Sequence, residues 1–173
     1  MRTIIIGLGN PILGDDGAGW QVAHLLRQRE GISSQVTIEC LSVGGISLME
    51  ALIGYDRAII IDVELTGAVP VGTVKRYKLE DIPDPWAGHI SSPHDTTLQN
   101  ALQVGRSLHA ILPEDIIIVT IEAQKVYEFS EDLTPKVAQA IPQAVGIILD
   151  LLIESNRKIT ANPIILRDEE YHR

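Results

Sequence analysis

Residues 4–19 run Ile4-Ile5-Ile6-Gly7-Leu8-Gly9-Asn10-Pro11-Ile12-Leu13-Gly14-Asp15-Asp16-Gly17-Ala18-Gly19, and their pattern sets the architecture that we expect for the chain. A run of β-branched residues enters a loop rich in glycine, and that loop carries two adjacent carboxylates. Apolar residues then follow Ala18 at helical spacing, at Val22, Leu25 and Leu26. The sequence therefore predicts a strand over about 3–7, a loop, and a helix over about 17–30.

The isoleucine run does not alternate with polar residues, which is typical of a strand buried on both faces of a parallel sheet. Ligands of such sheets collect just beyond the carboxyl ends of the strands. Asp15 and Asp16 fall at that position. One of two acids before a helix also commonly provides its N-cap, and we assign that role to Asp15.

The composition of the whole chain favours a single globular domain. Of its 173 residues 45% are hydrophobic and 4% aromatic, so we expect an aliphatic core in a domain over residues 1–155, followed by a polar tail over 156–173. The formal net charge of −9 disfavours nucleic acid and anionic membranes as partners. Cys40 is the only cysteine, which excludes a disulfide framework, and the chain starts without a leader pattern. The expected location is the cytoplasm.

Further strands and helices alternate along the chain. Strands are expected at 36–41, 57–63, 73–78 and 115–121, and helices at 47–52, from about 94 to 108, and at 134–152. Segment 73–78 alternates apolar with polar side chains, which is typical of an exposed antiparallel edge strand. The order predicts an α/β fold, a three-layer α/β/α sandwich whose mostly parallel twisted sheet has about five strands and one antiparallel edge strand.

Local signals indicate how several helices begin, bend and pack. Ser47 and Glu50 have the spacing of a capping box. Leu108 continues the apolar stripe of the helix that we expect to begin at about His94, so we expect it to be buried. Pro142 lies inside the last helix and should kink it or split its first turn.

Three polar residues stand where the backbone could bring them together: Asp16 after the first strand, Asp62 at the end of the third, and His94 at the end of a long loop. Two carboxylates and an imidazole are a reasonable ligand set for a zinc or nickel ion, and three protein ligands leave coordination positions open. Each residue taken alone also has an ordinary structural explanation, and no local motif such as His-Glu-x-x-His is present. The spacing by itself leaves both interpretations open.

The remaining candidates for chemistry are weaker. Glu64 and His89 are second choices as acid and as ligand. Ser91 and Ser92 lie near His94, but no Gly-x-Ser-x-Gly nucleophile elbow accompanies them. A dinucleotide is disfavoured because Gly7, Gly9 and Gly14 lack the Rossmann spacing, and because the two acids would repel a pyrophosphate.

Taken together, these segments resemble the hydrogenase maturation endopeptidase family. The resemblance rests on four motifs in the right order that span the chain up to about residue 153. They are Gly7-Leu8-Gly9-Asn10 with Asp15-Asp16 and Gly19, then Ile60-Ile61-Asp62, then Ser92-Pro93-His94, and last Leu133-Thr134-Pro135.

The resemblance implies a protease that removes the C-terminal extension of the nickel-containing hydrogenase large-subunit precursor once nickel is in place. It implies that Asp16, Asp62 and His94 bind a divalent metal and form the catalytic site, with nickel supplied by the substrate and with zinc or cadmium able to substitute in vitro. Family members are grouped as aspartic-type peptidases. The expected partner is the precursor, and a monomer is the simplest expected state because the site needs no second chain.

Two other interpretations stay open. Gly7-Leu8-Gly9-Asn10-Pro11 also resembles the start of bacterial peptidyl-tRNA hydrolases, although their Arg-His-Asn-x-Gly segment is missing here. A non-catalytic nickel-binding maturation factor could use the same three ligands. The segment Val43-Gly44-Gly45-Ile46 departs from the acid-Gly-Gly-Thr pattern of many protease relatives, which leaves the identity of the client precursor open.

Overall fold

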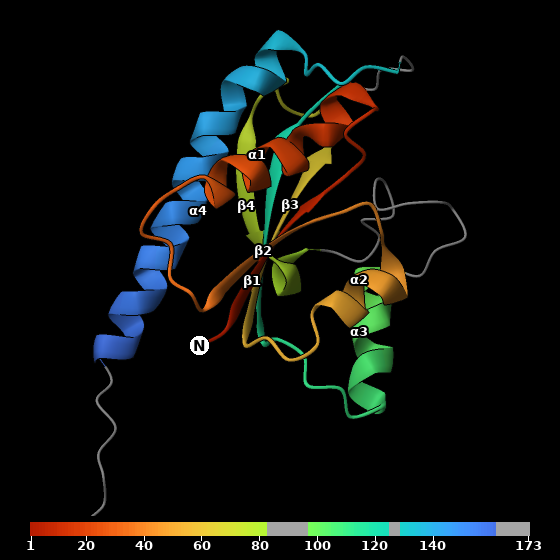
Figure 1. Ribbon diagram of the computed structural model, residues 1–173. Coiled ribbons are helices and arrows are strands. Elements are labelled where there is room, and N and C mark those ends of the chain that lie inside the picture. The colour runs from red at the N-terminus through yellow and green to blue at the C-terminus, as the bar shows by residue number, and fades with distance from the viewer. Residues whose placement is uncertain (83–96, 125–128, 162–173) are drawn as a thin grey trace, which may run out of the picture.

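The computed structural model describes residues 1–82, 97–124 and 129–161, and it contains a five-stranded sheet (Figure 1). The strand order is β2-β1-β3-β5-β4. The strands are β1 (Thr3–Leu8), β2 (Val36–Leu41), β3 (Arg57–Glu64), β4 (Val74–Lys78) and β5 (Asp115–Glu122). β2, β1, β3 and β5 are parallel, and β4 pairs antiparallel with β5 at the edge. The predicted mixed sheet is confirmed, with the antiparallel edge strand counted among the five.

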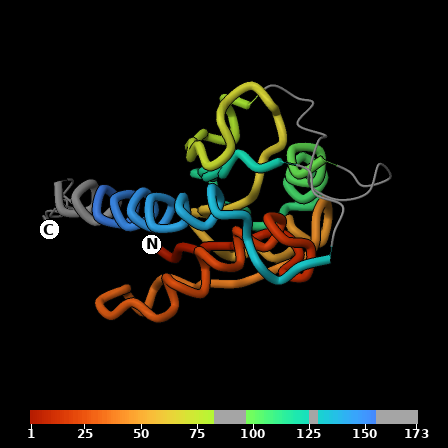
Figure 2. Tube along the Cα trace, turned by 90° about the horizontal axis from the view of Figure 1, so that it is seen from above, coloured from red at the N-terminus to blue at the C-terminus, as the bar shows by residue number. Residues whose placement is uncertain are grey.

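Helices cover both faces of the sheet, as the predicted three-layer sandwich requires. They are α1 (Ala18–Arg27), α2 (Gly45–Ala51), α3 (Leu98–Ser107) and α4 (Pro135–Ala161), with short 3-10 turns η1 (Gly14–Gly17) and η2 (Leu79–Asp81). Figures 1 and 2 show α1 and α4 on one side of the strands and α2 and α3 on the other.

The isoleucine-rich strands form the middle of this sandwich. Every residue of β1 and β3 is buried, as expected for strands covered on both faces. Alternate residues of β3 point to opposite sides: Ile59 and Ile61 pack with α1 and α4, while Ala58 and Ile60 pack with α2 and α3. Two aliphatic cores therefore lie back to back across one sheet.

The chain changes direction between β1 and β3. β1 leads into α1 on one face, whereas its neighbour β3 leads, by way of β4 and η2, to α3 on the opposite face. At such a switch point the loops that leave the carboxyl ends of neighbouring strands diverge and open a crevice for ligands. The carboxyl ends of β1 and β3 are therefore the place where a site is expected.

Several local expectations are wrong for reasons that the structure makes plain. Leu25 is 41% exposed because it lies at the edge of the α1 stripe, and Leu108 is 73% exposed because α3 ends at Ser107. The capping box at Ser47 does not form, since α2 begins earlier, with Gly44 as its N-cap and no side-chain cap bond.

The last helix is longer than expected. α4 runs through Pro142 without being split, and its backbone continues to Ala161, into the segment expected to be a polar tail. Residues 162–173 lie outside the described residues.

By length and composition, Pro135–Glu154 of α4 could cross a membrane, since its mean hydropathy reaches 1.5. Its apolar stripe, however, lies in the core on the α1 side of the sheet, at Val137, Ile141, Ala144, Val145, Ile148 and Leu151. Packing against the sheet accounts for this stripe, and 39% of the membrane-length window is buried.

Candidate functional site

The loop after β1 folds back on itself so that Asp16 lies beside the end of the strand it came from. Gly9 has a φ of 118°, a conformation that favours glycine, and a Cβ there would lie 1.8 Å from the carbonyl oxygen of Asp16. The N–H of Asn10 donates to Oδ2 of Asp16 at 2.6 Å. The glycine therefore permits a turn that fixes the Asp16 carboxylate at the carboxyl edge of the sheet.

A second close approach holds the start of α1 against two strands. A Cβ on Gly19 would lie 2.3 Å from the carbonyl oxygen of Leu8 in β1 and 2.6 Å from that of Ile61 in β3. A Cβ on Gly7 would lie 2.2 Å from the carbonyl oxygen of Gly19. Because no side chain separates these backbones, η1 and Asp16 lie against the carboxyl ends of β1 and β3.

Asp62 reaches the same point from β3. Its side chain is 4% exposed, and its Oδ1 accepts a hydrogen bond of 2.8 Å from the N–H of Val63. Burial raises the pKa of Asp62 from 3.8 to about 8, the Val63 hydrogen bond opposes this rise, and the negative charge of Asp16 adds to it. The carboxyl group is therefore largely protonated at neutral pH in the isolated protein.

Asp16 and Asp62 thus lie close enough for the charge of one to act on the other. Each has one carboxylate oxygen bonded to a backbone N–H, and within the described residues the second oxygen of each has no hydrogen-bond partner. Two such oxygens fit a divalent cation, which would relieve the repulsion between the carboxylates as it displaces the proton. The donor set therefore fits two of the three ligands that the sequence predicts.

Asp62→Asn should stabilise the isolated protein at neutral and alkaline pH. An acid whose pKa is raised in the folded state contributes stability that is present below its unfolded pKa and is lost as pH rises toward the folded value, here from 3.8 to about 8. Asparagine keeps an oxygen for the Val63 N–H and does not titrate. The gain over wild type should reach a few kcal/mol near pH 8 and become small near pH 4.

Urea denaturation of wild type and Asp62→Asn at several pH values measures this gain. Asp132→Asn, which alters an exposed carboxylate, is the matched control and should show no such trend. A difference between Asp62→Asn and wild type that does not change with pH would contradict the assigned protonation of Asp62.

His94, the third predicted ligand, lies outside the described residues, as do His89, Ser91 and Ser92. Over 1–82, 97–124 and 129–161, no group of three or more His, Cys, Asp or Glu side chains could hold a metal ion. His24 and His109 are exposed. The ligand set of Asp16, Asp62 and His94 stays a prediction.

Asp15 does not have the role that we assigned to it. α1 has Gly17 as its N-cap and no side-chain cap bond. The Asp15 carboxylate, 4% exposed, instead accepts hydrogen bonds from Thr134, from its N–H at 2.6 Å and its hydroxyl at 2.9 Å. Asp15 therefore joins the site loop to the residue that precedes α4.

Asp15→Ala should lower the free energy of unfolding by about 2–4 kcal/mol. The substitution removes two hydrogen bonds to a buried carboxylate and leaves the Thr134 N–H without its acceptor. Chemical denaturation measures the loss. Asp132→Ala changes an exposed side chain close to the same contact, so it should stay within about 0.5 kcal/mol of wild type. Equal stability of the two variants would show that the Asp15–Thr134 contact has little effect.

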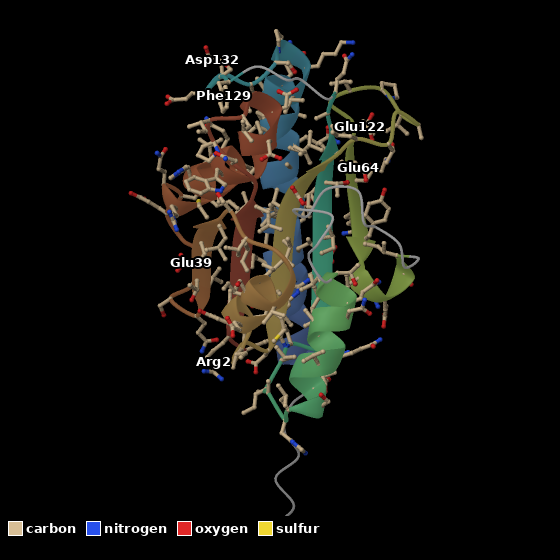
Figure 3. The ribbon with its side chains drawn as sticks, turned by 90° about the vertical axis from the view of Figure 1, so that its right-hand side faces the viewer. Arg2, Glu39, Glu64, Glu122, Phe129 and Asp132 are labelled. Atoms are coloured by element: carbon tan, nitrogen blue, oxygen red, sulfur yellow. The ribbon has the colours of Figure 1, made fainter. Side chains whose placement is uncertain are left out.

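Glu64, the second-choice acid, belongs to a different cluster. Figure 3 shows Glu64 and Glu122 side by side at the carboxyl ends of β3 and β5, where they are paired in register. Lys75 forms an ion pair with Glu64 and lies 3.9 Å from Glu122. Glu122 also accepts hydrogen bonds of 2.7 Å from the Thr66 hydroxyl and the Gly67 N–H. These two buried glutamates are thus partnered by residues that hold the connection between β3 and β4.

Comparison with known proteins places this geometry in a functional context. Residues 20–151 match the family model of hydrogenase maturation proteases. The hydrogenase 2 maturation protease of Escherichia coli (strain K12) is 28% identical over 155 residues, which cover 90% of this chain and 93% of that protein.

Solved structures agree. The hydrogenase maturating endopeptidase HybD from E. coli superposes with a TM-score of 0.74 at 28% identity, over 90% of this chain and 94% of that chain. A hydrogenase 2 maturation peptidase from a Thaumarchaeota archaeon gives a TM-score of 0.65 at 25% identity, over 88% and 98%.

Proposed function

The chain belongs to the hydrogenase maturation protease family, and from this we propose that it removes the C-terminal extension of a nickel-containing hydrogenase large-subunit precursor after nickel insertion. The observation that carries the proposal is the meeting of Asp16 and Asp62 at the switch point between β1 and β3. Two carboxylates, each with one oxygen outside the local backbone bonds, are suited to a cation that arrives with the substrate.

In this proposal the nickel ion is part of the substrate, and Asp16, Asp62 and His94 are the residues that bind it. A divalent cation polarises a peptide carbonyl or activates a water molecule, which promotes hydrolysis. Asp16 and Asp62 fix the position of the cation, and with it that of the C-terminal segment, relative to the protease. Either carboxylate could also act as the general base, the role that aspartic-type classification implies. Zinc or cadmium should occupy the same ligands in vitro.

We further propose that the protein acts as a cytoplasmic monomer. The site carboxylates come from one chain, so a second copy is not needed to complete them. A chain with a single cysteine cannot form an intrachain disulfide, which suits a reducing compartment. Gel filtration with light scattering tests the monomer, and a dimer mass would contradict it.

A processing assay tests the activity. Purified protein is mixed with a hydrogenase large-subunit precursor in nickel-loaded and nickel-free forms, and shortening of the precursor is followed by gel electrophoresis. The proposal predicts shortening of the loaded form only. Nickel-dependent binding to several precursors without any shortening would instead favour the non-catalytic maturation factor.

A further inference from the structure

The sheet face that α2 and α3 cover ends in polar residues at its carboxyl edge. On β3 and β5, side chains at alternate positions face this side, and residues paired in register between two strands point the same way. Ile60 and Ile118 form one apolar pair in the core of this face. The next two pairs along the strands are polar, Asp62 with Thr120 and then Glu64 with Glu122. Thr120 is therefore the lateral neighbour of Asp62.

Thr120 holds a hydroxyl group that the described fold does not use. The residue is fully buried, and within the described residues its Oγ1 has no hydrogen-bond partner. Glu122, two positions further on the same strand, has both carboxylate oxygens bonded. A buried hydroxyl without a partner is less stable than a valine of the same shape, so its presence calls for an explanation.

The geometry supplies a partner for this hydroxyl. Neighbouring strands lie about 4.8 Å apart, and Asp62 and Thr120 are paired in register, so their side chains are lateral neighbours on one face of the sheet. Oδ1 of Asp62 already accepts the Val63 N–H, whereas Oδ2 has no partner within the described residues. The acceptor and the donor that lack partners are thus on adjacent strands at the same register position.

We propose that Thr120 is a positioning residue for Asp62, whose carboxylate it holds by donating a hydrogen bond when that carboxylate binds the cation carried by the substrate. This inference rests on the proposed function. With the Val63 N–H on one side and the Thr120 hydroxyl on the other, the carboxylate is fixed from two directions. Hydrogen bonds from neighbours orient metal-binding carboxylates in this way, and their loss typically weakens metal affinity or activity about 10- to 100-fold.

The alternative is that Thr120 only fills space. Threonine is favoured in strands and has nearly the shape of valine, so a hydroxyl could be tolerated there without a role. Thr120→Val removes the hydroxyl and keeps the shape, and Thr120→Ser keeps the hydroxyl. Thr3→Val is the matched control, since Thr3 is buried in β1 at the opposite end of the sheet.

The test measures cadmium affinity of the free protein by isothermal titration calorimetry and the processing rate of nickel-loaded precursor, with melting temperatures alongside. Thr120→Val should bind cadmium and process precursor about 10- to 100-fold less well, at an unchanged or higher melting temperature. Thr120→Ser should recover most of both, and Thr3→Val should match wild type. If Thr120→Val melts at a lower temperature than wild type, Thr120→Ala serves as a second variant without the hydroxyl. Its cadmium affinity and processing rate must then also fall below those of Thr120→Ser.

Wild-type cadmium affinity and processing in Thr120→Val would overturn the inference while leaving the proposed function intact. If wild type binds cadmium but shortens no precursor, the proposed function fails, and a weaker cadmium affinity of Thr120→Val than of Thr120→Ser still supports the positioning role. If wild type neither binds cadmium nor shortens precursor, both proposals fail.

Discussion

Asp16→Asn should slow the shortening of nickel-loaded precursor by about a thousandfold or more, because binding of the cation and stabilisation of charge in the transition state are together worth several kcal/mol. The Asp16 carboxylate supplies one of the two oxygens that we assign to the cation. Asparagine retains an oxygen to accept the Asn10 N–H, so the loop should keep its shape. The loss of processing rate should therefore come from the missing negative charge and the weaker metal ligand, and not from a change in the loop.

The processing rate is measured at saturating precursor, with circular dichroism and melting temperature as checks of folding. Asp132→Asn changes an exposed acid at the same end of the molecule and should process at the wild-type rate (Figure 3). His94→Ala, at the predicted third ligand, should lose activity as Asp16→Asn does. Full activity in a correctly folded Asp16→Asn would remove Asp16 from the site.

Gly19→Ala should destabilise the fold more than any surface substitution. The added methyl carbon would lie within 2.9 Å of three backbone atoms, the carbonyl oxygens of Leu8 and Ile61 and the amide nitrogen of Leu8. Backbone atoms in two central strands cannot move aside as a side chain could, so α1 must shift away from the sheet. We expect a loss of about 3 kcal/mol or more, a large part of the stability of an ordinary domain.

Gly146→Ala is the matched control for that substitution. Gly146 lies inside α4, and a Cβ there would have no heavy atom within 4 Å. Alanine should therefore stabilise the helix by about 1 kcal/mol through its higher helix propensity. Urea denaturation of both variants measures the two changes in the free energy of unfolding, which should have opposite signs. Gly19→Ala with wild-type stability would contradict the close approach of α1 to β1 and β3.

The sequence predicted the strands, and it predicted that Asp16 and Asp62 lie at the carboxyl edge of the sheet, because both predictions depend on local pattern and on one general rule of parallel sheets. Uninterrupted isoleucine runs identify β1 and β3 as buried strands, and the carboxyl ends of such strands share an edge. The shared location of Asp16 and Asp62 follows from that rule, without any information on distances between atoms.

What the sequence could not indicate are contacts between distant residues. Asp15 has the local environment of an N-cap, but its partner Thr134 lies 119 positions away. Thr120 reads as an ordinary strand residue, and only the register of β3 against β5 places it beside Asp62. Ser47 and Glu50 have the spacing of a capping box, but α2 begins at Gly45, with Gly44 as its N-cap, so Ser47 already lies inside the helix.

The most direct test of the central claim is the intact mass of nickel-loaded precursor after incubation with wild type or with Asp62→Asn. Wild type should release one C-terminal peptide and leave a single shortened subunit, whereas Asp62→Asn, although at least as stable, should leave the precursor at full length. Shortening by Asp62→Asn at the wild-type rate would contradict the claim that the paired carboxylates form the working site.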